Sequence, residues 1–145
     1  MTNGCPAANK RAYVLIYLLE TRLRKFIVDK LEKKSVTEQS GGWLRYIPHD
    51  VLNTCQRRSV ANHSSYQNLG SHQLMDYSDL TDLGKICYRN PDAFSEFGNL
   101  QVLSVKLKEI DMIRNTVAHN RKLSNSEFGR LRIAYKDIMR FIERS

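Results

Sequence analysis

The chain has 145 residues, and its 23 lysines and arginines outnumber its 15 acidic residues, which gives a net charge of +8. This length suffices for a hydrophobic core, so we predict one small domain over residues 1–145 with no need of a structural cross-link. The longest apolar run, Ala12 to Leu19, is too short for a bilayer and lacks a following small-residue cleavage site. We therefore expect neither a membrane anchor nor a signal peptide.

Cysteine and histidine usage points away from a metal centre. Cys5, Cys55 and Cys87 are odd in number and far apart, and no C-x-x-C pair or zinc-type histidine spacing accompanies them. Reduced thiols in a cytoplasmic protein are the simplest interpretation. We expect no metal and no cofactor.

Apolar residues recur at the three- and four-residue steps of amphipathic helices, and no segment shows persuasive strand alternation. This spacing predicts a long first helix from about Asn9 to Lys34, which Ser40-Gly41-Gly42 separates from the next helical segment. Pro48-His49-Asp50 can begin a second helix that runs to about Asn62. The polar stretch from Ala61 to His72 is typical of a loop or a frayed helix end, and is the best candidate for mobility.

A further helix is predicted from about Tyr77 to Arg89 and ends before Pro91, because the residue before proline disfavours the α region. A short turn with Phe94 and Phe97 comes next, and then a helix from about Asn99 to His119.

The last helix has the clearest boundary in the sequence. Ser124 and Glu127 have the spacing of a capping box, and Leu123 and Phe128 that of a hydrophobic staple. The short connection from Asn120 to Leu123 predicts that the two final helices are antiparallel. Together these elements predict an all-α fold, a compact up-and-down bundle of about four to five helices.

The most informative motif is Arg114-Asn115-Thr116-Val117-Ala118-His119, near the end of a helical segment. It combines a phosphate-binding cation, a polar amide and a titratable base. Five helical residues turn by about 140° and rise by about 7.5 Å, so Arg114 and His119 can flank a phosphate or meet groups from a second copy. The alternative is that Arg and His in the last turns simply complement the helix dipole.

Two acidic residues are candidates to support the motif. Asp111 shares a helix face with Asn115 and His119, next to the apolar stripe, and is placed to orient Arg114 or Asn115. Glu20 lies within the apolar run of the first helix, where a carboxylate often needs a cation, and Arg114 or Arg22 can supply it.

The segment from Leu107 to Arg121 resembles the signature helix of the HEPN superfamily. Further resemblance lies in the charged first helix, from Leu18 to Ile27, and in the closing helix after Arg121-Lys122-Leu123-Ser124. The resemblance implies a compact helical bundle that dimerises, and many such proteins are metal-independent ribonucleases.

The resemblance further implies that His119 and Arg114 act on RNA, that Asn115 assists, and that two copies build a composite cleft. Products would then carry a 2′,3′-cyclic phosphate and a 5′-hydroxyl. Some relatives are silenced by nucleotide transfer to a tyrosine two positions after the motif histidine. This chain has Arg121 there, so we do not expect that form of regulation.

Positive charge is concentrated at the two ends of the sequence. Basic and acidic residues number 8 and 4 over 1–40, 5 and 6 over 41–100, and 10 and 5 over 101–145. First and last helices in one bundle would present a positive field that attracts a polyanion. Arg121 and Lys122 beside the motif are the candidate RNA-binding residues. The alternative is that these charges only solvate helix surfaces.

The leading hypothesis is a homodimeric endoribonuclease of the HEPN type, a toxin or a defence effector with a cognate antitoxin or regulatory protein. The rival is a non-catalytic module of the same fold that binds RNA, nucleotides or a protein. A DNA-binding helical protein is a third class, but no recognition helix stands out. Apolar residues such as Tyr13, Ile16 and Tyr17 can line a dimer interface, although we favour burial within the bundle for most of them.

Structural roles are the preferred interpretation for several other residues. The remaining histidines, His49, His63 and His72, are expected to be solvated. Trp43 and Tyr46 are expected to pack in the core. For Arg57-Arg58 we weigh phosphate contacts against a solvated helix face and favour the latter.

Overall fold

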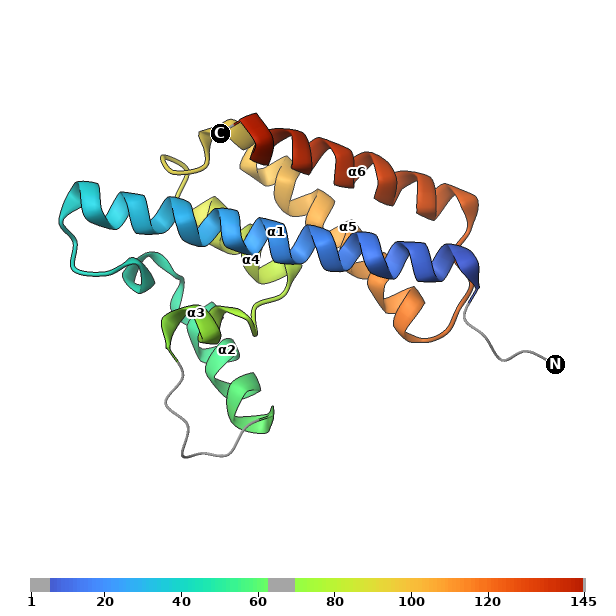
Figure 1. Ribbon diagram of the computed structural model, residues 1–145, viewed down its shortest axis with the longest axis horizontal. Helices are drawn as coiled ribbons and strands as arrows, with labels where there is room; N and C mark the ends of the chain where they lie inside the picture. Colours follow the sequence, from blue (N-terminus) through green and yellow to red (C-terminus); the bar gives the residue numbers. More distant parts are fainter. Residues whose placement is uncertain (1–5, 63–69, 145) are drawn as a thin grey trace.

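The computed structural model describes residues 6–62 and 70–144, and every regular element in these two ranges is a helix. This confirms the all-α prediction. Five helices have ten or more residues, and α3 has a single turn (Figure 1). The elements are α1 (Ala7–Glu38), η1 (Trp43–Tyr46), α2 (His49–Asn62), α3 (Ser71–Met75), α4 (Leu80–Arg89), η2 (Ser95–Phe97), α5 (Leu100–Ala118) and α6 (Asn125–Arg144).

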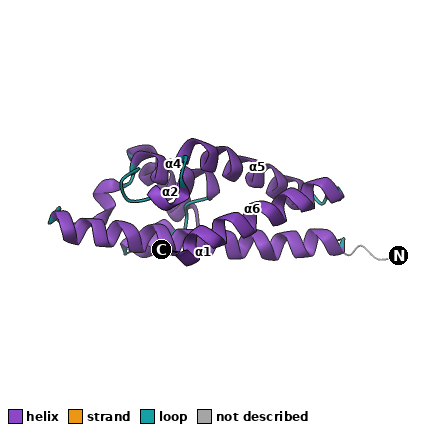
Figure 2. Ribbon diagram, turned by 90° about the horizontal axis from the view of Figure 1, so that it is seen from above, coloured by secondary structure: helices purple, strands orange, loops and turns teal. Residues whose placement is uncertain are grey.

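Helix α1 runs the length of the molecule and is the element around which the others pack. It contacts α5 and α6, while α4 packs most extensively against α5. Seen from above, α1 lies along one side of the molecule and α4 and α5 lie along the other (Figure 2). Helices α5 and α6 run in opposite directions, as predicted, so the start of α1, the end of α5 and the start of α6 meet at one end of the bundle (Figure 1).

The apolar stripe of α1 explains its length. Its buried side chains recur every three or four residues, so one face of the helix is covered by the bundle while the opposite face stays in water. The helix ends where Gln39 adopts a left-handed conformation with φ of 51° and donates its N–H to Ser35 and Val36 carbonyls. The buried apolar residues are Ala12, Ile16, Leu19, Leu23, Phe26, Ile27, Val28 and Leu31.

Two boundaries differ from the predictions. Helix α4 begins at Leu80 instead of Tyr77, because Asp79 is its N-cap: the Asp79 carboxylate accepts the Asp82 N–H at 2.8 Å, and the Asp82 carboxylate accepts the Asp79 N–H at 3.1 Å. In the predicted loop from Ala61 to His72, α2 continues to Asn62 and α3 already begins at Ser71. The expected mobility concerns mainly residues 63–69. These residues, His63 among them, lie outside the described residues.

The capping box at the start of α6 is confirmed. The Glu127 carboxylate accepts the Ser124 N–H at 3.0 Å, and the Ser124 hydroxyl accepts the Glu127 N–H at 3.1 Å. Hydrogen bonds from Ser124 lower the pKa of Glu127. Its contribution to stability is therefore present above the ordinary glutamate pKa of about 4.3 and is lost as the pH falls through the lower folded-state value.

Replacing Ser124 with alanine is expected to lower the free energy of unfolding by about 1 kcal/mol, because the Glu127 N–H loses its acceptor. Urea denaturation at neutral pH measures this change. Ser126→Ala is the matched control, since Ser126 is exposed in the same helical turn. Equal stability of the two variants would contradict a role for the cap.

Candidate functional site

The predicted motif lies at the last turn of α5, where the helix ends. Asn115 and His119 are exposed, and the His119 N–H donates to the Asn115 carbonyl at 3.0 Å. Asn120 then takes a positive φ of 58°, and the Arg121 N–H donates to the Thr116 carbonyl at 3.0 Å. This termination leaves the His119 imidazole at the surface of one end of the bundle.

A buried asparagine of α1 fixes the loop that comes after the motif. The Asn9 side chain is fully buried, donates to the Arg121 carbonyl at 2.8 Å and accepts the Leu123 N–H at 3.0 Å. Both bonds join residues more than a hundred positions apart. Asn9 therefore holds the backbone between His119 and α6 against the first turn of α1, a role that the sequence did not suggest.

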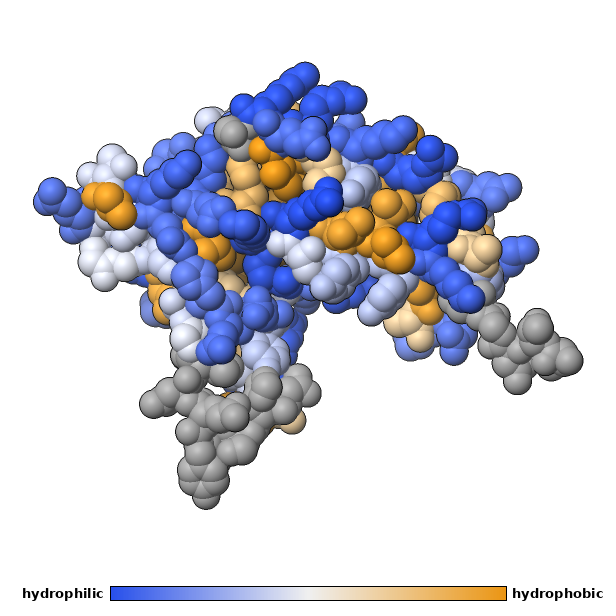
Figure 3. Space-filling view, in the orientation of Figure 1, coloured by the Kyte–Doolittle hydropathy of each residue, from blue (hydrophilic) through white to orange (hydrophobic). Residues whose placement is uncertain are grey.

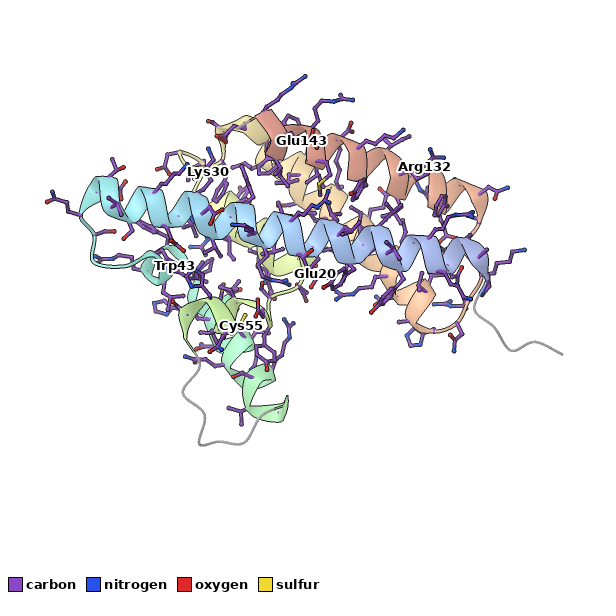
Figure 4. All side chains as sticks on the ribbon, in the orientation of Figure 1. Glu20, Lys30, Trp43, Cys55, Arg132 and Glu143 are labelled. Atoms are coloured by element: carbon purple, nitrogen blue, oxygen red, sulfur yellow. The ribbon has the colours of Figure 1, made fainter. Side chains whose placement is uncertain are left out.

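Arg114 is held by carboxylates on two helices. Its guanidinium lies 3.1 Å from Glu20 Oε2 of α1 and 3.4 Å from Asp111 Oδ1 of its own helix. Both contacts were among the sequence expectations and are confirmed. Glu20, near the midpoint of α1, is labelled in Figure 4. The side chain of Glu20 is only 15% exposed, so this pairing fixes Arg114 more firmly than a surface ion pair would.

Glu20 binds a second arginine that the sequence reasoning missed. Arg24 Nη2 donates to Glu20 Oε1 at 2.8 Å and to the Ser78 carbonyl at 2.7 Å. Its position four residues after Glu20 is the helical spacing that could have identified it. Arg22, the other expected partner of Glu20, instead donates to the Tyr135 hydroxyl at 3.3 Å.

The charges of this cluster balance. Arg24 and Arg114 face Glu20 and Asp111, so the group has no net charge. A guanidinium has five N–H donors, and the two contacts of Arg114 leave others available on a side chain that is 39% exposed. Arg114 can therefore donate hydrogen bonds to a bound group in a fixed geometry, while the attraction of a polyanion must come from other cations.

Two further cations, Arg121 and Lys122, are exposed on the loop after α5. Among the hydrogen bonds and ion pairs of residues 6–62 and 70–144, none links the His119 side chain to Arg114, Asn115 or Arg121. One protomer thus assembles the Glu20–Arg114–Asp111 cluster, and leaves His119, Asn115, Arg121 and Lys122 as separate exposed groups around it.

A cleft of about 350 Å³ opens beside Arg114, between α1 and α5. Tyr13 and Tyr17 line it and are 64% and 59% exposed. The preference for burying these two residues in the bundle was therefore wrong, although Ile16 between them is buried. Figure 3 shows hydrophobic residues at the surface along the N-terminal half of α1, on its side toward α6, whereas the hollow lined by the two tyrosines lies between α1 and α5. We call this hollow the tyrosine cleft; its wall also includes Glu20, Arg24, Arg114 and Val117.

The expected packing roles elsewhere are confirmed. Trp43 is buried with its ring 5.4 Å from that of His72. Tyr46 is partly buried against the core, and its hydroxyl donates to Glu38 at 2.6 Å. His49 is exposed, and His72 is exposed but pairs with Glu32 at 2.5 Å.

The two cysteines in the described ranges are buried thiols. Cys55 and Cys87 are free, and burial raises the pKa of Cys55 to about 11; Cys5 is outside the described residues. No group of three or more histidine, cysteine or acidic side chains suited to a metal ion occurs in the described ranges.

Arg58 corrects one of the predictions, because it is not a solvated surface residue. It donates to the Tyr77 carbonyl and to the carboxylates of Asp79 and Asp82. These contacts depend on the turn before α4, which local helical spacing in α2 does not reveal.

Replacing Glu20 with glutamine is expected to lower the free energy of unfolding by about 1–2 kcal/mol, because two partly buried guanidiniums lose their shared counter-charge. Thermal denaturation measures the change. Asp29→Asn is the control, since Asp29 pairs with Lys25 on the same helix where both are exposed, and its effect should stay below about 0.5 kcal/mol. Equal effects would show that the cluster contributes no more than a surface pair.

Comparisons of the chain with protein-family models, curated proteins and solved structures find no match. Within the described residues, no helix combines the length and apolar character that crossing a membrane requires. A functional assignment therefore depends on the motif and on the geometry around it.

Proposed function

We propose that the protein is a metal-independent endoribonuclease of the HEPN type, acting as a homodimer. One observation carries the proposal: an exposed imidazole and an exposed amide, His119 and Asn115, lie in the last turns of α5, which also carry the Arg114 guanidinium that two carboxylates hold in place. This combination supplies the three kinds of group that RNA cleavage by the neighbouring 2′-hydroxyl requires, namely a proton carrier, a polar donor and a fixed cation.

The chemistry needs no metal. The 2′-oxygen attacks the phosphorus as its proton passes to a base, the bond to the 5′-oxygen breaks, and that oxygen takes a proton from an acid. Histidine carries protons near neutral pH, and arginine donates to the phosphate oxygens that gain charge in the transition state. We assign proton transfer to His119, phosphate contact to Arg114 and assistance to Asn115.

A second copy completes the site in this proposal, because one histidine cannot both remove and supply a proton in the same step. The outward face of α5 offers a surface for pairing. Val105 and Met112 are exposed there, and they precede His119 at intervals of seven residues, so the three share a side of the helix. Two-fold packing on this face, with the axis passing near His119, would bring two motif histidines close together.

Cations at the same end of the bundle support RNA as the ligand. A hollow between α1 and α6 is lined by Lys10, Arg11 and Arg132, with no acidic residue among the described residues of its wall; Arg132 is labelled in Figure 4. With Arg121 and Lys122 these side chains supply the positive field that the balanced Arg114 cluster lacks. Such a field attracts a phosphate backbone and raises the rate of encounter.

Cleavage per protomer as a function of protein concentration tests the composite site. The rate of cutting a labelled single-stranded RNA should fall on dilution, at the concentration where sedimentation shows dimers dissociating. A rate per protomer that stays constant through dissociation would overturn the dimeric site. We extend the proposal to a cytoplasmic toxin or defence effector whose activity a cognate antitoxin or regulatory protein restrains.

The second candidate is a non-catalytic module that binds RNA, nucleotides or a protein. The charge balance around Arg114 favours it, since two carboxylates already neutralise the motif arginine and its neighbour. Such a module would bind RNA with an affinity that falls steeply with salt, and would leave the strand intact.

A further inference from the structure

The tyrosine cleft has features that the reaction at His119 does not use. Tyr13 and Tyr17 are four residues apart on α1 and line the same hollow. Among the described residues, neither hydroxyl has a hydrogen-bond partner, whereas the hydroxyl of Tyr46 is bonded to Glu38 and that of Tyr135 accepts from Arg22. The two exposed rings therefore contribute little to the fold, and their apolar surface remains available to a ligand.

The charge of the cleft points to an uncharged ligand. Two arginines, Arg24 and Arg114, are balanced by two carboxylates, Glu20 and Asp76, in its wall. The two carboxylates offset the attraction of the guanidiniums for a phosphate inside the cleft, although Arg114 keeps free N–H donors for a phosphate at the motif. The apolar part of the wall, formed by Ile16, Val117 and the tyrosine rings, suits a flat aromatic group instead.

The size and position of the tyrosine cleft limit the kinds of ligand that it can hold. A volume of about 350 Å³ lies within the range of small-ligand pockets, at its lower end. The cleft ends at Ala118, the residue before His119, and Arg114 belongs to both the cleft and the motif. A group held in the cleft therefore lies close to the end of α5, and the loop that comes next carries the exposed cations Arg121 and Lys122.

We propose that the tyrosine cleft is a base-binding site, in which a nucleobase of single-stranded RNA stacks on Tyr17 and Tyr13 while its phosphate stays outside with the exposed cations. This inference rests on the proposed function, because it takes RNA as the ligand. Stacking on aromatic side chains tolerates every base, and the Asp76 carboxylate in the wall adds an acceptor for base N–H groups.

Binding of a fluorescent single-stranded RNA, measured by anisotropy, tests the cleft. The measurement uses the His119→Ala protein so that no strand is cut. Adding Tyr17→Ala should weaken binding by about fivefold to 150-fold, the range for loss of one stacked base. Tyr17→Phe should bind as before, because the hydroxyl is not used. Tyr88→Ala is the matched control, since Tyr88 of α4 is 57% exposed but lies outside the cleft.

A second probe separates stacking from other effects. An abasic ribose-phosphate oligomer of the same length should bind equally well to the protein with and without Tyr17→Ala. If Tyr17→Ala weakens both oligomers equally and converts dimers to monomers in sedimentation, the tyrosine face is an interface between copies and the inference fails. Unchanged affinity for the normal RNA would also overturn it.

The base-binding site and the ribonuclease proposal can fail separately. RNA that binds in a Tyr17-dependent way but is left intact by the wild-type protein would refute the ribonuclease and keep the cleft. RNA that is cleaved, and is bound equally by the proteins with and without Tyr17→Ala, would refute the cleft and keep the ribonuclease.

Discussion

Replacing His119 with alanine is expected to lower the rate of RNA cleavage by about 10²- to 10⁴-fold, the usual contribution of a general acid or base. The imidazole is exposed at the end of α5 and makes no side-chain hydrogen bond among the described residues. Its removal should therefore leave helix content, thermal stability and RNA affinity unchanged. The measurement is the single-turnover cleavage rate of a labelled RNA, with circular dichroism and anisotropy recorded on the same samples.

His49→Ala is the control for this substitution. His49 is also exposed, in the first turn of α2, and lies outside the motif. This variant should cleave at the wild-type rate. Equal activity of wild type and His119→Ala would locate the chemistry elsewhere and contradict the assignment.

Replacing Arg58 with alanine is expected to lower the free energy of unfolding by about 2–3 kcal/mol, a value reduced from that of a fully buried pair because Arg58 is partly exposed. Arg58 lies 2.9 Å from Asp82 and 3.1 Å from Asp79, and thereby ties α2 to the start of α4. In the Arg58→Ala variant, the buried Asp82 carboxylate loses the cation with which it pairs. Urea denaturation at neutral pH measures the effect.

The pH dependence of this variant has a definite sign. Burial raises the pKa of Asp82 above its ordinary value, despite the opposing effect of Arg58. The ionised carboxylate is therefore the unfavourable form in the folded protein, and Arg58→Ala should destabilise most at neutral pH and less as acid protonates Asp82. The neighbouring Arg57→Ala is the control, because Arg57 is exposed and its guanidinium donates to Thr54. Equal losses for the two arginines would contradict the clamp.

Most of the fold could be predicted because helices leave a strong local pattern. The three- and four-residue spacing of apolar side chains predicted α1, α4, α5 and α6. Pro48-His49-Asp50 predicted the start of α2, and the capping box at Ser124 predicted the start of α6. The predicted start of α4 at Tyr77 is three residues too early. Apolar spacing shows that Leu80 belongs to the helix but does not show which residue caps it. Asp79 and Asp82 form a reciprocal cap, but their pattern differs from the usual serine or threonine with glutamate.

The candidate site was predictable only in part. The pairing of Glu20 with Arg114 could be inferred from a simple rule, since a carboxylate in an apolar helix face needs a cation. The exposure of Tyr13 and Tyr17 could not be read in the same way. Helical spacing shows which residues share a face, but only the packing shows whether a neighbouring helix covers that face, and here a cleft remains. The contacts of Asn9 with the distant loop are equally invisible to local patterns.

Analysis of RNA fragment ends in excess chelator tests the central claim most directly. Purified protein and His119→Ala are each incubated with one end-labelled single-stranded RNA, and the termini of any fragments are determined. We predict fragments with 2′,3′-cyclic phosphate and 5′-hydroxyl ends from the wild-type protein alone. RNA left intact by both proteins, or fragments with 3′-hydroxyl and 5′-phosphate ends, would contradict a metal-independent ribonuclease that uses His119.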